Sequence, residues 1–488
     1  MTQIQRERPD DYFADWKERE ALAEAMIPLV GKLYRERNVK TYIYGHSLHN
    51  ESVLDIMKAH RAVRQVEQNE LSEFETYPVL KALSALELGA AHIDVGRMAV
   101  NYEESAKLQG VSVEDYVQSE VADLIGKNGA DTHKPRDVVL YGFGRIGRLM
   151  ARLLVEKAGG GENLRLRAIV IRPSGAKNDL VKRASLLQRD SVHGAFRGTI
   201  RVDEERQSFV ANGVEIKVIY AAKPEDVDYT AYGINDAIVI DNTGAFRGEE
   251  ELRRHLKSKG AAKVLLTAPG QGNLKNIVFG INNDAIEDSD DVITAASCTT
   301  NAICPPLKAI DEKFGIEFGH VETVHSYTND QNLIDNFHKA DRRGRSAALN
   351  MVITETGAAK AVSKVLPQFE GKLTGNAIRV PTPNVSMAIL NLTLTRETSV
   401  EELNEYMRQT ALHSDLRKQI AYSISPEVVS TDFVGTRTAC IFDAQATIVN
   451  GKHAVVYLWY DNEFGYSCQV HRVLEQMAGV SYAIYPKQ

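Results

Sequence analysis

The sequence has few cysteines, no long apolar run and no strongly basic stretch. Only four of its 488 residues are cysteine, which in a long chain is typical of free thiols in a reducing compartment. No run of about 18 apolar residues is present, the length that a membrane-spanning helix needs. The first residues, MTQIQRERPDDYFADW, lack the apolar segment of a secretory signal. We therefore expect a cytoplasmic protein with no membrane partner.

The charge balance argues against further classes of partner. The net charge is −7 and the pI is near 6.1. No cluster of Lys and Arg is dense enough for a phosphate-backbone footprint, so nucleic acid is not expected. No Cys-x-x-Cys motif or histidine pair has the spacing of metal ligands, so no metal site is expected. The composition, 43% hydrophobic and 25% charged, is that of an ordinary globular protein, and the length predicts two to four domains.

The first part of the chain shows helical spacing of its apolar residues. Gly and Pro are sparse over residues 1–127, and Ser72 stands three residues before Glu75, the spacing of a helix capping box. This region predicts an all-α extension. The polar segment 128–136, which carries Gly129 and Pro135, is typical of a linker.

Beyond the linker, short β-branched runs alternate with helical stretches. The order "VVLYGF", "RLMARLLVEKA", "LRAIVI" predicts strand, helix, strand, and hence a parallel α/β sheet over 137–297. From residue 298 the strands become longer and alternate, as in "SMAILNLTLTRE" and "HAVVYLWYDN". Residues 298–461 therefore predict a second, α+β domain with a mixed or antiparallel sheet.

A glycine pattern indicates the first functional site. Gly142, Gly144 and Gly147 follow a predicted strand and open a predicted helix, in G-x-G-x-x-G order. The first glycine allows a tight turn, the second lets the backbone approach a pyrophosphate, and the third lets the helix pack on the strand. The N–H groups of the helix start then face the phosphates. This context predicts a Rossmann-type site for NAD or NADP.

The next strand bears on the choice of cofactor. NAD-binding folds usually end it with an acidic residue that holds the ribose hydroxyls, whereas "AIVIRPSG" ends in Arg172 and Pro173. An arginine there can face the extra phosphate of NADP. The alternative, which the sequence leaves open, is that Arg172 is a solvated loop residue.

A cysteine in polar surroundings indicates the second site. Cys298 lies in "ITAASCTTNAIC", whereas a structural cysteine prefers apolar surroundings. His325 follows close in sequence, and an imidazole beside a thiol can lower its pKa. Thr328, Thr356 and Arg379 add groups that suit phosphate oxygens. These residue types predict covalent catalysis on a phosphorylated carbonyl compound beside a nicotinamide.

At these residues the sequence closely resembles phosphorylating glyceraldehyde-3-phosphate dehydrogenase. The motifs "GFGRIGR", "ASCTTNAICP", "TVHSYTNDQ", "TGAAKAV", "RVPTPNVS" and "WYDNEFGYS" occur in the family's order over roughly 137–480. The resemblance implies oxidation of glyceraldehyde 3-phosphate to 1,3-bisphosphoglycerate through a cysteine thioester, in glycolysis and gluconeogenesis. It also implies a homotetramer, and a last helix within 462–488 that returns to the cofactor domain.

The resemblance assigns roles to individual residues. Cys298 would be the nucleophile and His325 its base. Thr328 and Arg379 would bind the phosphate of the substrate. Inorganic phosphate would be bound by Ser297, Thr299, Thr356 and Gly357. The expected cofactor-binding residues are Gly142, Phe143, Gly144, Arg145, Ile146, Gly147, Arg172, Thr243, Gly244, Thr267, Asn462 and Tyr466.

Two departures from the family pattern concern the cofactor. The acidic ribose ligand is missing at Arg172, and the position where the family usually has Leu-Pro reads Asn336-Phe337. Family members that lack both tend to accept NADP. We therefore expect the chain to use NADP, alone or alongside NAD.

Two other functions remain open at the level of sequence. Relatives that oxidise erythrose 4-phosphate keep the cysteine and histidine but tend to depart within the stretch corresponding to "HSYTND", which is intact here. A non-catalytic scaffold, in which the extension binds a partner, is opposed by the intact set of Cys298, His325 and Arg379. The extension lies outside the resemblance, and its sequence does not reveal a role.

Overall fold

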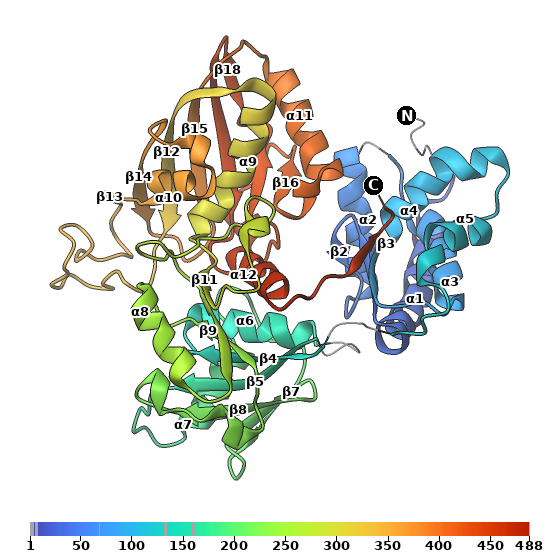
Figure 1. Ribbon diagram of the computed structural model, residues 1–488. Coiled ribbons are helices and arrows are strands. Elements are labelled where there is room, and N and C mark those ends of the chain that lie inside the picture. Colours follow the sequence, from blue (N-terminus) through green and yellow to red (C-terminus); the bar gives the residue numbers. More distant parts are fainter. Residues whose placement is uncertain (1–3, 5–7, 68, 131–133, 159–162, 488) are drawn as a thin grey trace. The chain divides into compact units, whose positions relative to one another are not determined.

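The computed structural model describes residues 4, 8–67, 69–130, 134–158 and 163–487 (Figure 1). The chain divides into two compact units. The first unit consists of Met1–Pro135, Ala158–Asn163 and Val480–Gln488, and the second consists of Arg136–Lys157 and Leu164–Gly479. In the described ranges no helix combines the length and the apolar character that crossing a membrane requires.

The first unit is mainly helical, as the sequence predicts. Its α-helices are α1 (Tyr12–Arg37), α2 (Val53–Glu67), α3 (Glu73–Ala85), α4 (Val95–Asn101) and α5 (Val113–Glu120). The predicted capping box at the start of α3 is confirmed: Ser72 Oγ accepts from the backbone at the helix start, and Glu75 Oε2 accepts from Ser72 N at 2.8 Å. Such caps satisfy N–H groups that have no partner within the helix.

The first unit is not all-α, which corrects the prediction from sequence. It contains a four-stranded sheet in the order β2-β1-β3-β20, made of β1 (Val39–Ile43), β2 (His46–Ser47), β3 (Ala91–Asp94) and β20 (Ala483–Tyr485). The strand β20 comes from the end of the chain and pairs in parallel with β3. Strands this short give little periodicity. The pairs β1–β3 and β3–β20 are parallel, so no hairpin turn reveals β3 or β20.

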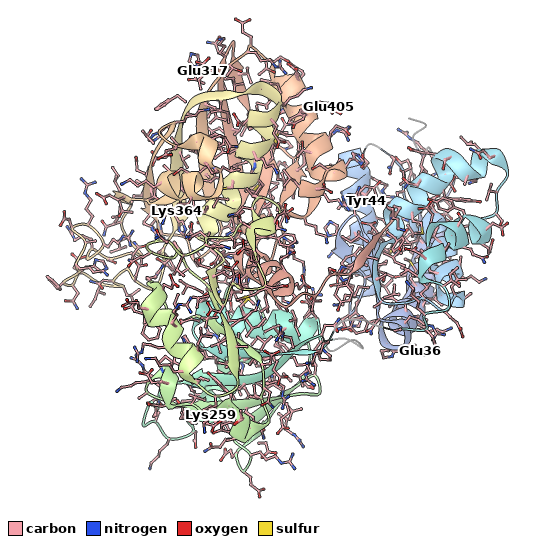
Figure 2. All side chains as sticks on the ribbon, in the orientation of Figure 1. Glu36, Tyr44, Lys259, Glu317, Lys364 and Glu405 are labelled. Carbon is pink, nitrogen blue, oxygen red and sulfur yellow. The ribbon has the colours of Figure 1, made fainter. Side chains whose placement is uncertain are left out.

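The core of the first unit includes both apolar side chains and one buried ion pair. Tyr485 on β20 is fully buried, and its hydroxyl donates to Asp123 Oδ1 at 2.6 Å. Glu73, also fully buried, accepts from Arg19 Nε at 2.7 Å and lies 3.1 Å from Nδ1 of His60. Tyr44, labelled in Figure 2, lies under the guanidinium of Arg97 in the same unit.

The second unit opens with the parallel sheet that the sequence predicts. The strand order is β11-β10-β9-β4-β5-β8-β7-β6. The pairs β8–β7 and β7–β6 are antiparallel, and the other neighbouring pairs are parallel. The strands are β4 (Arg136–Tyr141), β5 (Leu164–Ile171), β6 (Ile200–Asp203), β7 (Ser208–Ala211), β8 (Val214–Tyr220), β9 (Ala237–Asp241), β10 (Ala261–Leu266) and β11 (Val292–Thr294). The helices of this half are α6 (Arg145–Glu156), α7 (Asp179–Gln188) and α8 (Glu249–Leu252).

The rest of the second unit is built on a mixed, largely antiparallel sheet, again as predicted. Its order is β13-β14-β12-β15-β19-β17-β16, with β18 paired to β19. The strands are β12 (Ile316–Ser326), β13 (Val352–Glu355), β14 (Leu373–Val380), β15 (Ser386–Leu394), β16 (Ile420–Ser423), β17 (Cys440–Asp443), β18 (Ile448–Asn450) and β19 (His453–Tyr460). The helices are α9 (Cys298–Phe314), α10 (Ala358–Val365), α11 (Val400–His413) and α12 (Phe464–Met477). A large apolar cluster fills the space between α9 and the sheet.

The last helix is shorter than the expected segment 462–488. It ends at Met477, and it packs on α6 of the parallel-sheet half. The residues from Val480 onward belong to the first unit, where β20 lies. The prediction that 462–488 as a whole completes the cofactor domain is therefore wrong for its final nine residues.

Candidate active site

The thiol and the imidazole that the sequence singles out lie side by side. Cys298 is the first residue of α9, and Ser297 caps that helix by accepting from Thr300 N. His325 lies near the end of β12, and its Nε2 is 3.5 Å from Cys298 Sγ. A thiolate at the start of a helix is favoured by the N–H groups there. The geometry therefore allows a proton to pass from the sulfur to the ring nitrogen.

Strand register brings the predicted phosphate ligand to the same place. In the parallel pair β12–β14, Arg379 is the partner of His325. Its Nη1 is 2.8 Å from His325 Nδ1, and it donates to Ser326 O at 3.0 Å and to Thr328 Oγ1 at 3.3 Å. The predicted set of Cys298, His325, Thr328 and Arg379 is thus assembled in one location.

The other ring nitrogen of His325 determines which tautomer can act as a base. His325 Nδ1 lies 2.7 Å from the carbonyl oxygen of Ser326. When Nδ1 donates its proton to this carbonyl, Nε2 carries the lone pair that faces the thiol. The guanidinium of Arg379 is also close to Nδ1 and competes with the Ser326 carbonyl for a hydrogen bond to this nitrogen. A bound phosphate would attract the guanidinium and leave the histidine–carbonyl hydrogen bond intact.

Burial sets the protonation of both groups. It raises the pKa of the Cys298 thiol above its usual value, while the charge of Arg379 acts in the opposite direction. Burial, together with the charge of Arg379, lowers the pKa of His325 to about 3. The imidazole is therefore neutral at physiological pH and free to accept a proton, and the thiol depends on that acceptor and on Arg379 to ionise.

A buried tyrosine to which the sequence analysis assigned no role joins this set. Tyr460 at the end of β19 has its hydroxyl 3.0 Å from Thr299 Oγ1 and 2.7 Å from Thr323 Oγ1. Its ring packs edge-on to that of His325, with centroids 6.0 Å apart. Thr299, expected at inorganic phosphate, thus has its hydroxyl engaged with Tyr460. The motif "WYDNEFGYS" contained Tyr460, but only spatial proximity shows its contact with β12 and α9.

The backbone next to the site is strained. Ala296, two residues before the nucleophile, has φ +54° and is buried. Val385 has φ +66°, an outlier for a β-branched residue, and its carbonyl accepts from Ser326 Oγ at 2.9 Å. Such conformations persist only where the surrounding structure holds them, and they cluster at functional sites.

The remaining predicted phosphate ligands lie at helix starts. Ser297 Oγ is occupied in capping α9. Gly357 precedes α10, whose Lys364 is labelled in Figure 2, and Thr356 Oγ1 accepts from Ala358 N at 3.2 Å. Unfilled N–H groups at such a start suit an anion. The structure gives no direct contact between Thr356 or Gly357 and Cys298.

Two charged residues that the sequence did not single out lie beside Thr328. The Thr328 hydroxyl donates to Asp330, and Asp330 pairs with Arg343 at 2.7 Å. Arg343 Nε also donates to Thr354 Oγ1 at 3.2 Å. These contacts place a second guanidinium near the proposed phosphate ligands.

The glycine-rich turn has the form that a dinucleotide needs. Gly142 has φ +92°, and a Cβ there would lie 2.9 Å from Thr243 Cγ2. At Gly147 a Cβ would lie 2.4 Å from Gly142 O, so only glycine allows the close approach of α6. Gly144 has no atom within 4 Å of its Cβ position. This open position at the start of α6 fits a pyrophosphate.

Further cofactor candidates lie at the carboxyl ends of neighbouring strands. Thr243 donates from both N and Oγ1 to the buried Asp241, and Thr267 donates to the carbonyl of Asp241. Gly244 follows with φ +68°. Ligands of open parallel sheets bind at such strand ends.

The other expected cofactor residues differ in exposure. Arg172 is exposed at the end of β5. Phe143 is buried near Phe209, and Ile146 is half-buried on α6. The guanidinium of Arg145 forms ion pairs with Asp190 and Glu463, so its side chain is engaged with carboxylates.

The nicotinamide candidates lie at the start of α12. Asn462 Oδ1 accepts from Ser386 Oγ at 2.9 Å, which leaves its amino group to donate to a ligand. Tyr466 is buried, and its hydroxyl donates to Ala296 O at 2.8 Å, next to the strained turn before Cys298. Both residues therefore lie on the segment that leads from the thiol site to the dinucleotide half.

Comparison with known families agrees with this geometry. Residues 136–249 match the NAD binding domain of glyceraldehyde 3-phosphate dehydrogenase, and residues 297–462 match its C-terminal domain. The chain belongs to the glyceraldehyde-3-phosphate dehydrogenase family. It is therefore expected to bind a nicotinamide dinucleotide in the parallel-sheet half, where the open glycine turn lies.

Individual relatives of this dehydrogenase family show how far the similarity extends. A glyceraldehyde-3-phosphate dehydrogenase-like protein of Pseudomonas aeruginosa (strain UCBPP-PA14) is 62% identical over 464 residues, covering 95% of this chain and all of that protein. This similarity includes most of the first unit. The glyceraldehyde-3-phosphate dehydrogenase of Clostridium pasteurianum is 41% identical over 353 residues, 70% of this chain and 99% of the relative. Glyceraldehyde-3-phosphate dehydrogenase 1 of Bacillus subtilis is 41% identical and matches 68% of this chain and 95% of its own length.

Proposed function

We propose that the chain catalyses the phosphorylating oxidation of glyceraldehyde 3-phosphate to 1,3-bisphosphoglycerate. The observation that carries the proposal is the distance of 3.5 Å between Cys298 Sγ and His325 Nε2, with Arg379 and Thr328 next to them. A nucleophile, its base and cationic and hydroxyl ligands for a phosphate are the groups that this reaction requires.

In the first half-reaction, His325 Nε2 takes the proton of the Cys298 thiol, and the sulfur forms a bond to the aldehyde carbon. Arg379 and Thr328 hold the phosphate of the substrate. The carbonyl oxygen becomes the hydroxyl of a hemithioacetal by taking the proton from His325. His325 then removes that proton again as the hydride leaves, so that a thioester remains on Cys298. The nicotinamide of the cofactor, when bound, would supply the hydride acceptor.

In the second half-reaction, inorganic phosphate attacks the thioester carbon. The C–S bond breaks, the sulfur leaves as the thiolate of Cys298, and the acyl phosphate departs. His325 passes its proton to the sulfur or to the phosphate that leaves with the product. Thr356, Gly357 and the start of α10 are proposed to hold the attacking phosphate, because helix N–H groups favour anions.

We further propose that NADP is accepted. Support comes from the exposed Arg172 at the end of β5, where an acidic residue would repel the 2′-phosphate. Asn336-Phe337 in the loop after β12 replaces the Leu-Pro that the family usually has.

A homo-oligomer is also part of the proposal. Large apolar side chains are exposed on the segment between β12 and β13: Leu333, Ile334, Phe337, Leu349 and Met351, each more than 70% exposed. Large apolar side chains exposed together on one segment indicate an interaction site, and a second copy of the chain would cover them. Light scattering would show a mass above that of one chain, with a tetramer expected.

A steady-state assay tests the proposed reaction. The protein is supplied with glyceraldehyde 3-phosphate and inorganic phosphate, with NAD in one arm and NADP in the other, and the reduced cofactor is followed by absorbance. Phosphate-dependent reduction supports the proposal. Higher kcat/KM with erythrose 4-phosphate would reassign the substrate, and no turnover with either aldehyde would indicate a non-catalytic role.

A further inference from the structure

A network of charged side chains connects the pyrophosphate turn with the residue expected at the nicotinamide. Arg145, the first residue of α6, donates from Nε to Glu463 Oε1 at 2.8 Å and from Nη2 to Oε2 at 2.6 Å. Glu463 directly follows Asn462 in the chain. This bidentate ion pair therefore joins the open turn at Gly144 to the start of α12. Its two residues, Arg145 and Glu463, are 318 positions apart in sequence.

Other contacts hold the two partners of this pair in place. The remaining nitrogen of the Arg145 guanidinium, Nη1, forms an ion pair with Asp190. Asp190 Oδ1 accepts hydrogen bonds from the N–H groups of Val192 and His193. His193 Nε2 in turn lies 3.1 Å from Glu463 Oε2. The side chains of Asp190 and His193 are each only 5% exposed. We call Arg145, Asp190, His193 and Glu463 the latch.

The residue before Asn462 is fixed as firmly as the residue after it. Asp461 Oδ1 accepts from Glu463 N at 3.0 Å and from Asn384 Nδ2 at 2.9 Å, and its Oδ2 accepts from Gly435 N at 2.8 Å. With both neighbours held and its own Oδ1 engaged by Ser386, Asn462 has one orientation in which its amino group can donate.

Burial alone would raise the pKa of Glu463, but hydrogen bonds from His193 and Arg145 lower it overall. The carboxylate is thus ionised at neutral pH. Two parallel charge-assisted hydrogen bonds fix direction as well as distance, which a single contact does not.

On this geometry, and resting on the proposed function, we infer that Glu463 and Arg145 are positioning residues for hydride transfer. Through the latch, Arg145 acts on the nicotinamide end of the cofactor by holding Asn462, and its guanidinium is not a direct ligand of the pyrophosphate. The main-chain N–H groups at the start of α6 remain the phosphate ligands.

The test compares two ligands that differ only in the nicotinamide. Binding of the accepted dinucleotide is measured by calorimetry beside that of ADP-ribose, or of its 2′-phosphate if NADP is preferred. In Glu463→Gln, which keeps the shape and removes the charge, the dinucleotide should bind about 10-fold more weakly, the scale of one lost hydrogen bond. ADP-ribose should bind as it does in the parent. Glu402→Gln, in an exposed pair with Arg396, is the matched control and should change neither.

Two kinetic readouts separate positioning from loss of structure. A misplaced nicotinamide should lower kcat by about 100-fold, the scale of a displacement near 1 Å. The deuterium isotope effect with the C1-deuterated aldehyde should rise because hydride transfer becomes slower. Alkylation of Cys298 should keep its rate. The double variant of Arg145→Gln and Glu463→Gln should cost little more than either single change.

Several results would overturn the inference. Equal weakening of ADP-ribose and dinucleotide would mean that the latch acts on the phosphates or on the whole site, and unchanged binding with unchanged kcat would mean that it does nothing for the cofactor. If Glu463→Gln does not fold, the same two ligands are compared in Arg145→Lys, which keeps the positive charge but loses the bidentate geometry of the guanidinium. If the parent binds both ligands but oxidises no aldehyde, the proposed function fails while the binding comparison still tests the latch.

Discussion

Removing the side chain of Tyr485 should unfold the first unit at a lower temperature without affecting the second. Tyr485 is fully buried on β20, and a large aromatic-to-alanine change in a core costs about 3–5 kcal/mol. The hydrogen bond to Asp123 contributes little of this, about 0.5–1 kcal/mol, because the Asp123 side chain is 51% exposed. Tyr485→Ala should therefore be much more harmful than Tyr485→Phe.

The expected loss is large for a unit of about 150 residues. Domains of this kind are stable by about 5–15 kcal/mol, so the substitution removes a third or more of the stability at the middle of that range. At about 2–4 °C per kcal/mol for this size, the midpoint of unfolding should fall by about 6–20 °C.

The two tryptophans of the chain allow each unit to be followed separately. Trp16 lies on α1 of the first unit and Trp459 on β19 of the second. Fluorescence in a Trp459→Phe background reports unfolding around Trp16, and the converse variant Trp16→Phe reports the second unit. The Trp16 transition should shift in Tyr485→Ala, while the Trp459 transition and the alkylation of Cys298 stay as in the parent.

The matched control is Tyr12→Ala, since Tyr12 lies in the same unit and is 69% exposed. It should change the free energy of unfolding by no more than about 0.5 kcal/mol, the range typical of surface positions. An unshifted Trp16 transition in Tyr485→Ala would show that β20 is not part of the first unit in solution, and the assignment of the C-terminal residues would be wrong.

The remaining predictions concern the thiol site, the cofactor and acid stability. Cys298→Ser should abolish oxidation, since a hydroxyl beside one imidazole is a far poorer nucleophile than a thiolate; substantial turnover, measured by absorbance of the reduced cofactor, would contradict the covalent route. His325→Asn should slow turnover by about 100- to 10,000-fold and also slow alkylation of the thiol at neutral pH; an unchanged alkylation rate would show that another group activates it. Arg172→Asp should raise the KM for NADP far more than that for NAD, and equal changes would make Arg172 a surface residue. The pKa of Glu73, although raised by burial, is lowered overall to about 2 by its partners His60 and Arg19. Its stabilisation is therefore present above the unfolded value near 4.5 and lost as pH falls towards 2. In thermal melts from pH 7 to 3, the midpoint temperature of the Trp16 transition should fall more steeply with decreasing pH in the parent than in Glu73→Gln. Parallel curves would show that the ionised Glu73 is not the source of this pH dependence.

Short sequence motifs were enough to predict the two halves of the second unit. The spacing of Gly142, Gly144 and Gly147 depends on steric limits within one turn, and the structure shows the close contact at Gly147 that the pattern implies. Cys298 and His325 could be paired because a thiol in polar surroundings suggests a nearby base. The capping box at Ser72 is likewise a contact between residues three positions apart.

What the sequence did not reveal depends on contacts between distant segments. The hydroxyl of Tyr460 meets Thr299 across 161 positions, and the pair of Arg145 and Glu463 spans 318. The strain at Ala296 is imposed by its surroundings, since alanine itself has no preference for positive φ. In the first unit, β3 and β20 were missed because β3 pairs in parallel with both of its partners, and β20 is far from it in sequence.

The position of β20 has a consequence for synthesis. About 390 residues separate β3 from β20, and at about 5–20 residues per second a ribosome needs about 20–80 seconds to make them. During that interval the growing chain carries the helices of the first unit beside a sheet whose β3 edge has no fourth strand, and an open edge invites pairing with other chains. The edge is closed only after the second unit has been made, so a chain that stops before β20 is left with an incomplete first unit.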